Sequence, residues 1–232
     1  MCIRDRDGAE TAAQAFGGLG MIIDVTVEGQ VAEFVQKTEA ALGPIDVYVS
    51  NAGVLMTDEP SWDAAGATDA NWQRAFEVNL MGAGRGARHV WPRMRERGGG
   101  IFVIVASAAG LLAQIGAAPY TATKHAAVAF AESLSIAHGD DGLQVVCVCP
   151  QGVRTAMLGD SEDGGIAGVD GIVEPSAVAQ VTLTAIEEKT FFALPHPNVA
   201  DYEVMRAGQR DRWLGGMRKF RRKIMSERGR PI

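Results

Sequence analysis

The chain has 232 residues, of which 47% are hydrophobic and 22% are charged, and its formal net charge is −6. This length and balance are typical of a single globular domain with a substantial core, and they exclude a largely disordered chain. The acidic balance disfavours nucleic acid as a partner. No apolar run reaches the roughly 20 residues that a bilayer span needs, so no membrane partner is expected.

The first six residues, Met1 to Arg6, match neither the apolar core of a signal peptide nor a helical pattern. They read as the translation of a transposon adapter used in sequencing libraries. We therefore expect residues 1–6 to be a non-native start that is fused to a fragment of a longer gene.

Five short apolar runs, taken in chain order, are nearly continuous in hydrophobicity, as strands covered on both faces are. They are Met21–Val25, Ile45–Ser50, Ile101–Ala106, Leu143–Cys149 and Phe191–Leu194. Helical spacing between them predicts helices from about Val31 to Leu42, from about Asn71 to Arg97 and from near Ala118 to about His138. Strands that alternate with helices predict a Rossmann-like, doubly wound parallel sheet, in one domain over residues 1–232.

The cysteines show neither a metal-ligand spacing nor a disulfide framework, so no metal site is expected. Cys147 and Cys149 alternate along a predicted strand and are expected to face the same side of the core. Cysteine use of this kind indicates a reducing compartment, the cytoplasm.

Small and polar residues follow four of the predicted strands. A doubly wound sheet binds ligands beyond the carboxyl ends of its strands, so these segments are candidate site loops. They are Asp24-Val25-Thr26, Asn51-Ala52-Gly53, Ser107-Ala108-Ala109-Gly110 and Pro150-Gln151-Gly152.

Tyr120 and Lys124 lie four residues apart on a predicted helix, so they share one face with Cβ atoms about 5–6 Å apart. A free tyrosine has a pKa of about 10, too high for efficient proton exchange at neutral pH. A lysine cation at about 4 Å contributes about 4 kcal/mol at an effective dielectric constant of about 20. We therefore expect Lys124 to lower the pKa of Tyr120 to about 7, with desolvation opposing part of the change.

Six motifs, in order and at their spacings, resemble the short-chain dehydrogenase/reductase family. They are Asp24-Val25-Thr26, Asn51-Ala52-Gly53, Asn79-Leu80, Ser107, Tyr120-x-x-x-Lys124 and Pro150-x-Gly152-x-x-Thr155. The resemblance runs from Asp24 almost to the end of the chain. It implies an oxidoreductase that interconverts a secondary alcohol and a ketone by hydride transfer with NAD or NADP.

The resemblance also implies a role for each catalytic residue. Tyr120 would exchange a proton with the substrate oxygen, and Ser107 would orient that oxygen. Lys124 would lower the pKa of Tyr120 and bind the nicotinamide ribose, while Asn79 would hold a water in a proton relay. The residues implied to bind the cofactor are Asp24, Val25, Asn51, Ala52, Gly53, Tyr120, Lys124, Pro150, Gly152, Val153 and Thr155.

The family's first strand, glycine-rich phosphate loop and first helix have no counterpart in this sequence, so a truncated member is expected. The formal G-x-G-x-x-G/A pattern of Gly82–Ala87 falls inside a predicted helix, not at a turn from strand to helix. The residue that selects NAD or NADP would fall at the adapter-like start, and the preference stays open.

Two further interpretations stay open beside the oxidoreductase. One is a catalytically incompetent fragment or a non-catalytic nucleotide-binding member of the same fold. The other, an epimerase or dehydratase of nucleotide sugars, is disfavoured because too little chain follows Lys124.

The region Met157–Val173 is expected to be a short lid over a small-molecule alcohol or ketone. By resemblance alone, the long helices would pair subunits into a homodimer or homotetramer.

Without the phosphate loop, the backbone donors that hold a pyrophosphate are lost. Titration of the 232-residue chain with NAD(H) and NADP(H), followed by calorimetry, should therefore show severely weakened binding. Tight binding of either dinucleotide would contradict the inferred loss of the loop.

Overall fold

The computed structural model describes residues 6–58, 62–158 and 165–228, so most of the adapter-like start lies outside it. The helices are α1 (Arg6–Ala15), α2 (Glu28–Leu42), α3 (Asp69–Phe76), α4 (Gly82–Glu96), α5 (Ala118–His138), α6 (Pro175–Glu188), α7 (Asn198–Gly208) and α8 (Arg210–Arg228). The strands are β1 (Val47–Ser50), β2 (Gly100–Val105), β3 (Leu143–Val148), β4 (Gly152–Val153), β5 (Ile172–Val173) and β6 (Phe192–Ala193).

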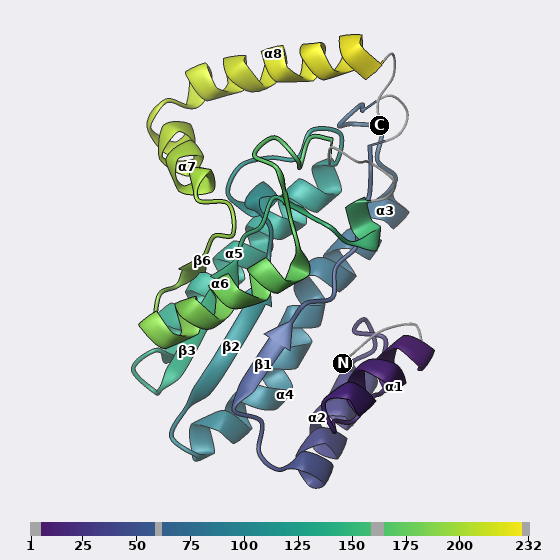
Figure 1. The fold of residues 1–232 in the computed structure, drawn as a ribbon, viewed down its shortest axis with the longest axis vertical. Helices are drawn as coiled ribbons and strands as arrows, with labels where there is room; N and C mark the ends of the chain where they lie inside the picture. The colour runs from purple at the N-terminus through teal and green to yellow at the C-terminus, as the bar shows by residue number, and fades with distance from the viewer. Residues whose placement is uncertain (1–5, 59–61, 159–164, 229–232) are drawn as a thin grey trace.

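The main sheet is parallel and has the strand order β1-β2-β3-β6 (Figure 1). Val47 pairs with Ile101, and Ile101 pairs with Gln144, so β2 lies between β1 and β3. The short strand β6 joins through Cys147 and Phe192. Strands alternating with helices around a parallel sheet confirm the predicted Rossmann-like α/β fold.

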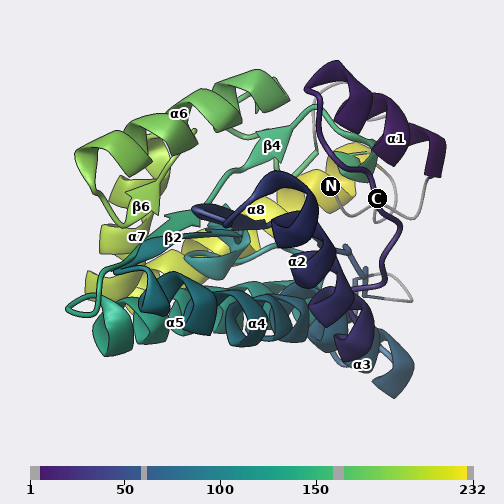
Figure 2. The same cartoon turned by 90° about the horizontal axis from the view of Figure 1, so that it is seen from below.

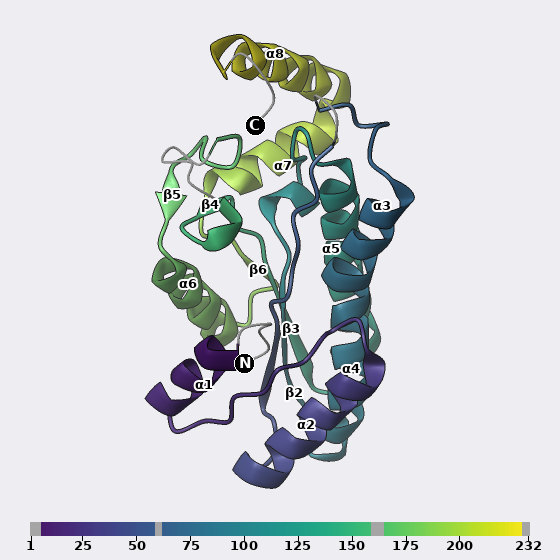
Figure 3. The same ribbon diagram turned by 90° about the vertical axis from the view of Figure 1, so that its right-hand side faces the viewer.

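Helices cover both faces of this sheet, α4 and α5 on one side and α6 on the other (Figure 3). Side chains of each strand alternate between the two faces. Phe102 and Ile104 pack with α4 and α5, whereas Val103 packs with Val146 under α6. This double coverage explains why the strands are nearly continuous in hydrophobicity. Viewed from below, α2 lies beside α4, where the two helices pack together (Figure 2).

The predicted helices largely agree with the structure. Helix α2 ends at Leu42, where Gly43 adopts a φ of 92° that favours glycine. Helix α5 has the bounds that the sequence predicted. The long helix expected from about Asn71 to Arg97 consists of α3, a π-helical turn over Glu77–Met81, and α4.

The strand predicted at Met21–Val25 is wrong. Met21 makes an isolated bridge, and the next residues form no regular strand. The backbone instead turns at Asp24, whose Oδ1 accepts hydrogen bonds from the Thr26 amide at 2.9 Å and the Thr26 hydroxyl at 2.8 Å. This local turn competes with extended structure and leads the chain into α2. In the described chain β1 is therefore an edge strand, with Val49 53% exposed.

Beyond the carboxyl ends of the strands, the chain forms a second layer of cover. Strands β4 and β5 pair in a small parallel sheet, and α8 runs across the top of Figure 1. The side chains of Trp62, Ile166 and Ile224 form a separate apolar cluster that attaches α8 to the body. None of the helices in the described ranges is long and apolar enough to cross a membrane.

Gly86 on α4 provides a test of how closely α4 packs on the sheet. An added Cβ would lie 2.6 Å from the Tyr48 ring, which stacks on Phe102 with ring centroids 5.1 Å apart. Gly86→Ala should lower the free energy of unfolding by about 1–2 kcal/mol, because the clash outweighs the gain in helix propensity. Urea denaturation measures the change.

Gly84 is the matched control on the same helix, because an added Cβ there meets no atom within 4 Å. Gly84→Ala should raise the stability by up to about 1 kcal/mol through helix propensity alone. Equal effects of the two substitutions would contradict the described packing of α4 on β1.

Candidate active site

Ser107 follows β2 and begins the short 3-10 turn Ala108–Gly110. Its hydroxyl oxygen accepts a hydrogen bond from the Ala109 amide at 3.1 Å and donates to the Pro150 carbonyl at 3.4 Å. The Ala108 amide also donates to the Pro150 carbonyl, at 2.8 Å. These contacts hold the loops after β2 and β3 against each other at the carboxyl edge of the sheet.

Tyr120 lies in the first turn of α5, and its side chain is buried beside this loop. Burial raises the pKa of Tyr120 above its ordinary value, and a hydrogen bond with the Ser107 side chain offsets part of the rise. The two hydroxyl groups thus share one small, dehydrated region.

Lys124 is one turn further along α5 and is 4% exposed. Its Nζ donates a hydrogen bond to the Val105 carbonyl at 2.9 Å and lies 5.7 Å from the centroid of the Tyr120 ring. Burial lowers the pKa of Lys124 to about 8. The hydrogen bond to β2 therefore holds the Lys124 amine in a buried position close to the Tyr120 ring.

The expected electrostatic effect of Lys124 on Tyr120 differs from what the structure gives. The expectation was a lowered pKa of Tyr120, but burial of the phenol dominates and raises it. A full cation at about 4 Å would lower the pKa of the phenol if both groups kept their contact with water. In the folded chain both groups are buried, and desolvation penalises both charged forms.

Asn79 lies in the π-helical turn and is 4% exposed. Its Oδ1 accepts from the Val54 amide at 2.8 Å, and its Nδ2 donates to the Val54 carbonyl and to Thr123 Oγ1, both at 3.0 Å. The amide therefore connects the loop after β1 to α5. Such π-helical turns occur frequently at functional sites.

Thr123 was not predicted as a site residue. It is 1% exposed, and its hydroxyl donates to the Pro119 carbonyl at 2.8 Å while accepting from Asn79. Its position three residues after Tyr120, on the inner face of α5, is the one sequence signal that indicates it.

The loop after β1 reaches the same place. A Cβ added to Gly53 would lie 3.5 Å from both Asn79 Oδ1 and Lys124 Nζ, so the missing side chain leaves space beside the amine. Ala52 is half-buried, and Asn51 is exposed at the carboxyl edge of the sheet.

The segment after β3 is held by a buried histidine that the sequence did not single out as a site residue. His196 Nδ1 accepts from the Gln151 amide at 3.2 Å, and its Nε2 lies 3.3 Å from the Gly171 carbonyl. Gly152 is buried and donates to the Ala167 carbonyl at 2.8 Å. Beyond it, Val153 is half-buried and Thr155 is exposed.

Part of the predicted lid region, Met157–Val173, lies outside the described residues. Its described parts include Met157 and Leu158, which end a 3-10 turn, and β5, which pairs with β4.

Asp24 and Val25 contact a different part of the chain. The Asp24 amide donates to Gln30 Oε1 at 2.7 Å, and the Val25 carbonyl accepts from Arg85 at 3.3 Å. These contacts join the turn to α2 and α4. Of the predicted cofactor residues, these two therefore contact a separate region, and the loops after β1, β2 and β3 meet at the catalytic side chains.

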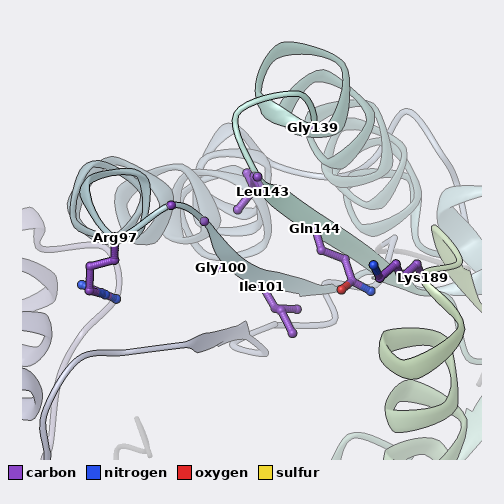
Figure 4. A pocket seen from close by; sticks show the side chains of 10 residues that line it. Arg97, Gly100, Ile101, Gly139, Leu143, Gln144 and Lys189 are labelled. Atoms are coloured by element: carbon purple, nitrogen blue, oxygen red, sulfur yellow. The ribbon is translucent and has the colours of Figure 1, made fainter.

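A cavity of about 420 Å³ lies at the opposite, amino end of β2 and β3 (Figure 4). Arg97, Lys189 and Gln144 line it together with glycine backbone, and no acidic, tyrosine or serine side chain does. It therefore lacks the acid–base groups that the carboxyl end brings together. No group of three metal-ligating side chains occurs within the described ranges.

Comparison with known proteins defines the class of the chain. Residues 1–164 match the family model for short chain dehydrogenases, which is more than half of the sequence. The chain belongs to the short-chain dehydrogenase/reductase family. A solved family member from Burkholderia phymatum, crystallised in complex with NAD, has the same fold, with a TM-score of 0.79 and 24% identity over 90% of this chain and 84% of that one.

Curated relatives include oxidoreductases of several kinds. An uncharacterized NAD-dependent oxidoreductase of Mycobacterium tuberculosis is 36% identical over 137 residues, which are 59% of this chain and 48% of the relative. The ketoacyl reductase HetN of Nostoc is 31% identical over 190 residues, 81% of this chain and 64% of the relative. The chain spans about half to two thirds of the length of such relatives.

Lys124→Met should stabilise the protein at pH 7, because it removes a buried cation and keeps a similar volume. The pKa of Lys124 falls from 10.5 to about 8 on folding. That change corresponds to a cost of about 3 kcal/mol below pH 8, of which the unpaired Val105 carbonyl would retain about 1–2 kcal/mol. The melting temperature should rise by several degrees.

The stabilisation should shrink between pH 8 and pH 10.5, because the unfolded wild-type chain binds more protons there and wild-type stability rises with pH. Lys37→Met, at an exposed lysine whose Nζ lies 2.6 Å from Glu33 Oε1, is the control for the loss of a lysine at the surface. A lower melting temperature for Lys124→Met at pH 7 would contradict the assigned cost of burial.

Proposed function

We propose that the protein is an NAD(P)-dependent oxidoreductase that interconverts a secondary alcohol and a ketone. The observation that carries the proposal is the buried amine of Lys124, 5.7 Å from the centroid of the buried Tyr120 ring, with buried Ser107 in the loop after β2 at the carboxyl edge of a parallel sheet. Within the described ranges Lys124 forms no ion pair with a carboxylate, and burial of such a lysine is costly, so a purely structural role accounts poorly for it.

In the proposed reduction, Tyr120 donates its phenolic proton to the carbonyl oxygen of the substrate. In oxidation it accepts the proton of the alcohol. Ser107 orients the substrate oxygen and stabilises the charge that develops on it. A bound nicotinamide dinucleotide supplies or accepts the hydride.

Lys124 contributes through its position and its donors. An ammonium group has three donors, and within the described ranges the Lys124 amine donates one of them to the Val105 carbonyl. The remaining donors suit a ribose hydroxyl next to Gly53, where no side chain intervenes. A pKa of about 8 lets Lys124 exchange a proton near neutral pH, which supports a relay that includes Asn79.

The proposed cofactor surface combines the described loops. An NAD-dependent relative and a family member solved with NAD support NAD as the cofactor. Kinetics with NADH and NADPH distinguish NAD from NADP. The proposed contacts are Asp24 and Val25 with the adenine, Asn51, Ala52 and Gly53 with the adenosine ribose, and Pro150, Gly152, Val153 and Thr155 with the nicotinamide.

The proposed substrate is a small molecule of moderate size. Ketoacyl reductases of Nostoc and Streptomyces coelicolor are among the relatives, which supports a carbonyl next to an acyl chain as one candidate. The reduced, buried Cys147 and Cys149 support a cytoplasmic location, and a homodimer or homotetramer is proposed from the family.

Tyr120→Phe should reduce turnover of a ketone substrate by about 10²–10⁴-fold, because the acid–base group is lost. The dissociation constant for the dinucleotide should stay within a factor of two or three. Steady-state kinetics with NADH and NADPH, together with calorimetry, measure the two effects.

Tyr48→Phe is the control, because it removes a phenolic hydroxyl from the packed face of β1 and leaves the catalytic loop unchanged. A binding module without catalysis would show no turnover in the wild-type chain even at saturating dinucleotide, and unchanged dinucleotide affinity in both variants. That result would sink the oxidoreductase proposal.

A further inference from the structure

The first turn of α5 lacks a cap from its own segment. Helices leave their first amide groups without intrahelical acceptors, and a side chain before the helix usually accepts from one of them. The residue at this position is Ala117, which has no side-chain acceptor. Tyr120 follows three residues later, so the uncapped turn is the one that holds the proposed catalytic phenol.

Asp58 supplies the missing acceptor from sixty residues earlier in the chain. Its Oδ1 accepts a hydrogen bond from the Ala118 amide at 2.8 Å. Its own backbone amide donates to the Gly116 carbonyl at 2.7 Å. The two bonds lie on either side of Ala117 and fix the approach to α5.

The environment of Asp58 keeps water away from these bonds. Asp58 is 3% exposed, and its carbonyl accepts from the Trp62 amide at 3.3 Å. The indole of Trp62 packs against Gly116 so closely that an added Cβ would lie 2.6 Å from it. Gly116 has a φ of 78°, which favours glycine.

Helix α8 covers this arrangement from outside. Trp62 packs with Ile224 of α8, and Arg221 of the same helix donates to the Trp62 carbonyl at 3.4 Å. Asp58 therefore contacts α5, and Trp62 contacts α8. A carboxylate at the start of a helix is also stabilised by the helix dipole.

We infer that Asp58 is a positioning residue that caps α5 and thereby holds Tyr120 against Ser107. The kinetic part of this inference rests on the proposed function, whereas the structural part concerns the Tyr120 side chain alone. Loss of the cap would fray the first turn, admit water to Tyr120 and loosen the contact with Ser107.

The test uses ionisation of Tyr120, which is independent of turnover. Ultraviolet titration of the chain, minus that of Tyr120→Phe, isolates the Tyr120 phenol. Burial is the largest cause of its raised pKa, so hydration in Asp58→Ala should lower that pKa toward 10.0. Asp58→Asn keeps an oxygen acceptor and should leave the pKa unchanged, which separates the hydrogen bond from the charge.

Asp63→Ala is the matched control in the same segment. The Asp63 carboxylate accepts from the nearby Ala65 amide at 3.0 Å, so its removal should not affect Tyr120. If Asp58→Ala does not fold, Asp58→Ser serves instead, because its oxygen is one bond shorter and does not reach the Ala118 amide. An unchanged Tyr120 pKa in a folded Asp58→Ala or Asp58→Ser variant overturns the inference.

Kinetics provide the second measurement. Asp58→Ala should lower kcat by about 10–100-fold, since a misplaced group costs rate, while KM for the dinucleotide stays unchanged. Asp58→Asn should restore most of kcat. If neither the wild-type chain nor any variant turns over at saturating dinucleotide but the Tyr120 pKa still shifts, the proposed function fails and the positioning role stands. A fall in kcat that Asp58→Asn and Asp63→Ala share equally would contradict the cap.

Discussion

Strand β2 pairs in parallel with β1 on one side and with β3 on the other, without a break in register. Because parallel strands finish at the same edge, the loops that follow them meet there. Ser107 and Pro150 are joined across this edge by a hydrogen bond, and Lys124 reaches it by donating to the last carbonyl of β2. The same pairing leaves glycine-rich turns and the cavity at the other end, where no acidic, tyrosine or serine side chain lines the cavity.

Local patterns in the sequence predicted the parallel α/β fold, the bounds of α5 and the facing of Cys147 and Cys149, whose sulfur atoms lie 3.8 Å apart. These features depend on periodicity and on glycine stops, which are patterns of residues close together in the sequence. The strand at Met21–Val25 failed because apolarity alone does not reveal that the Asp24 side chain will bond to its own backbone.

The environments of the candidate site residues depend on contacts between residues far apart in the sequence. The spacing of Tyr120 and Lys124 predicted that they share one face of the helix. The burial of each side chain, which sets the direction of its pKa shift, depends on the loops packed over them. The partners of Asn79 lie 25 and 44 residues away. Asp58 carries no motif, and its contact with Ala118 follows from tertiary packing alone. Burial also creates a conflict, since the buried position on which the proposed role of Lys124 depends lowers the stability of the fold.

The π-helical turn at Glu77–Met81 accommodates one residue more than a regular α-helical turn does. It is therefore equivalent to a one-residue insertion in an otherwise continuous helix. Since successive helical residues are rotated by about 100° around the helix axis, deletion of one residue here would rotate Asn79 away from Val54 or rotate Gly82 away from Val25. In alignments of related chains, sequences with a single-residue gap at this position should therefore lack a side chain that reaches the Val54 backbone as Asn79 does.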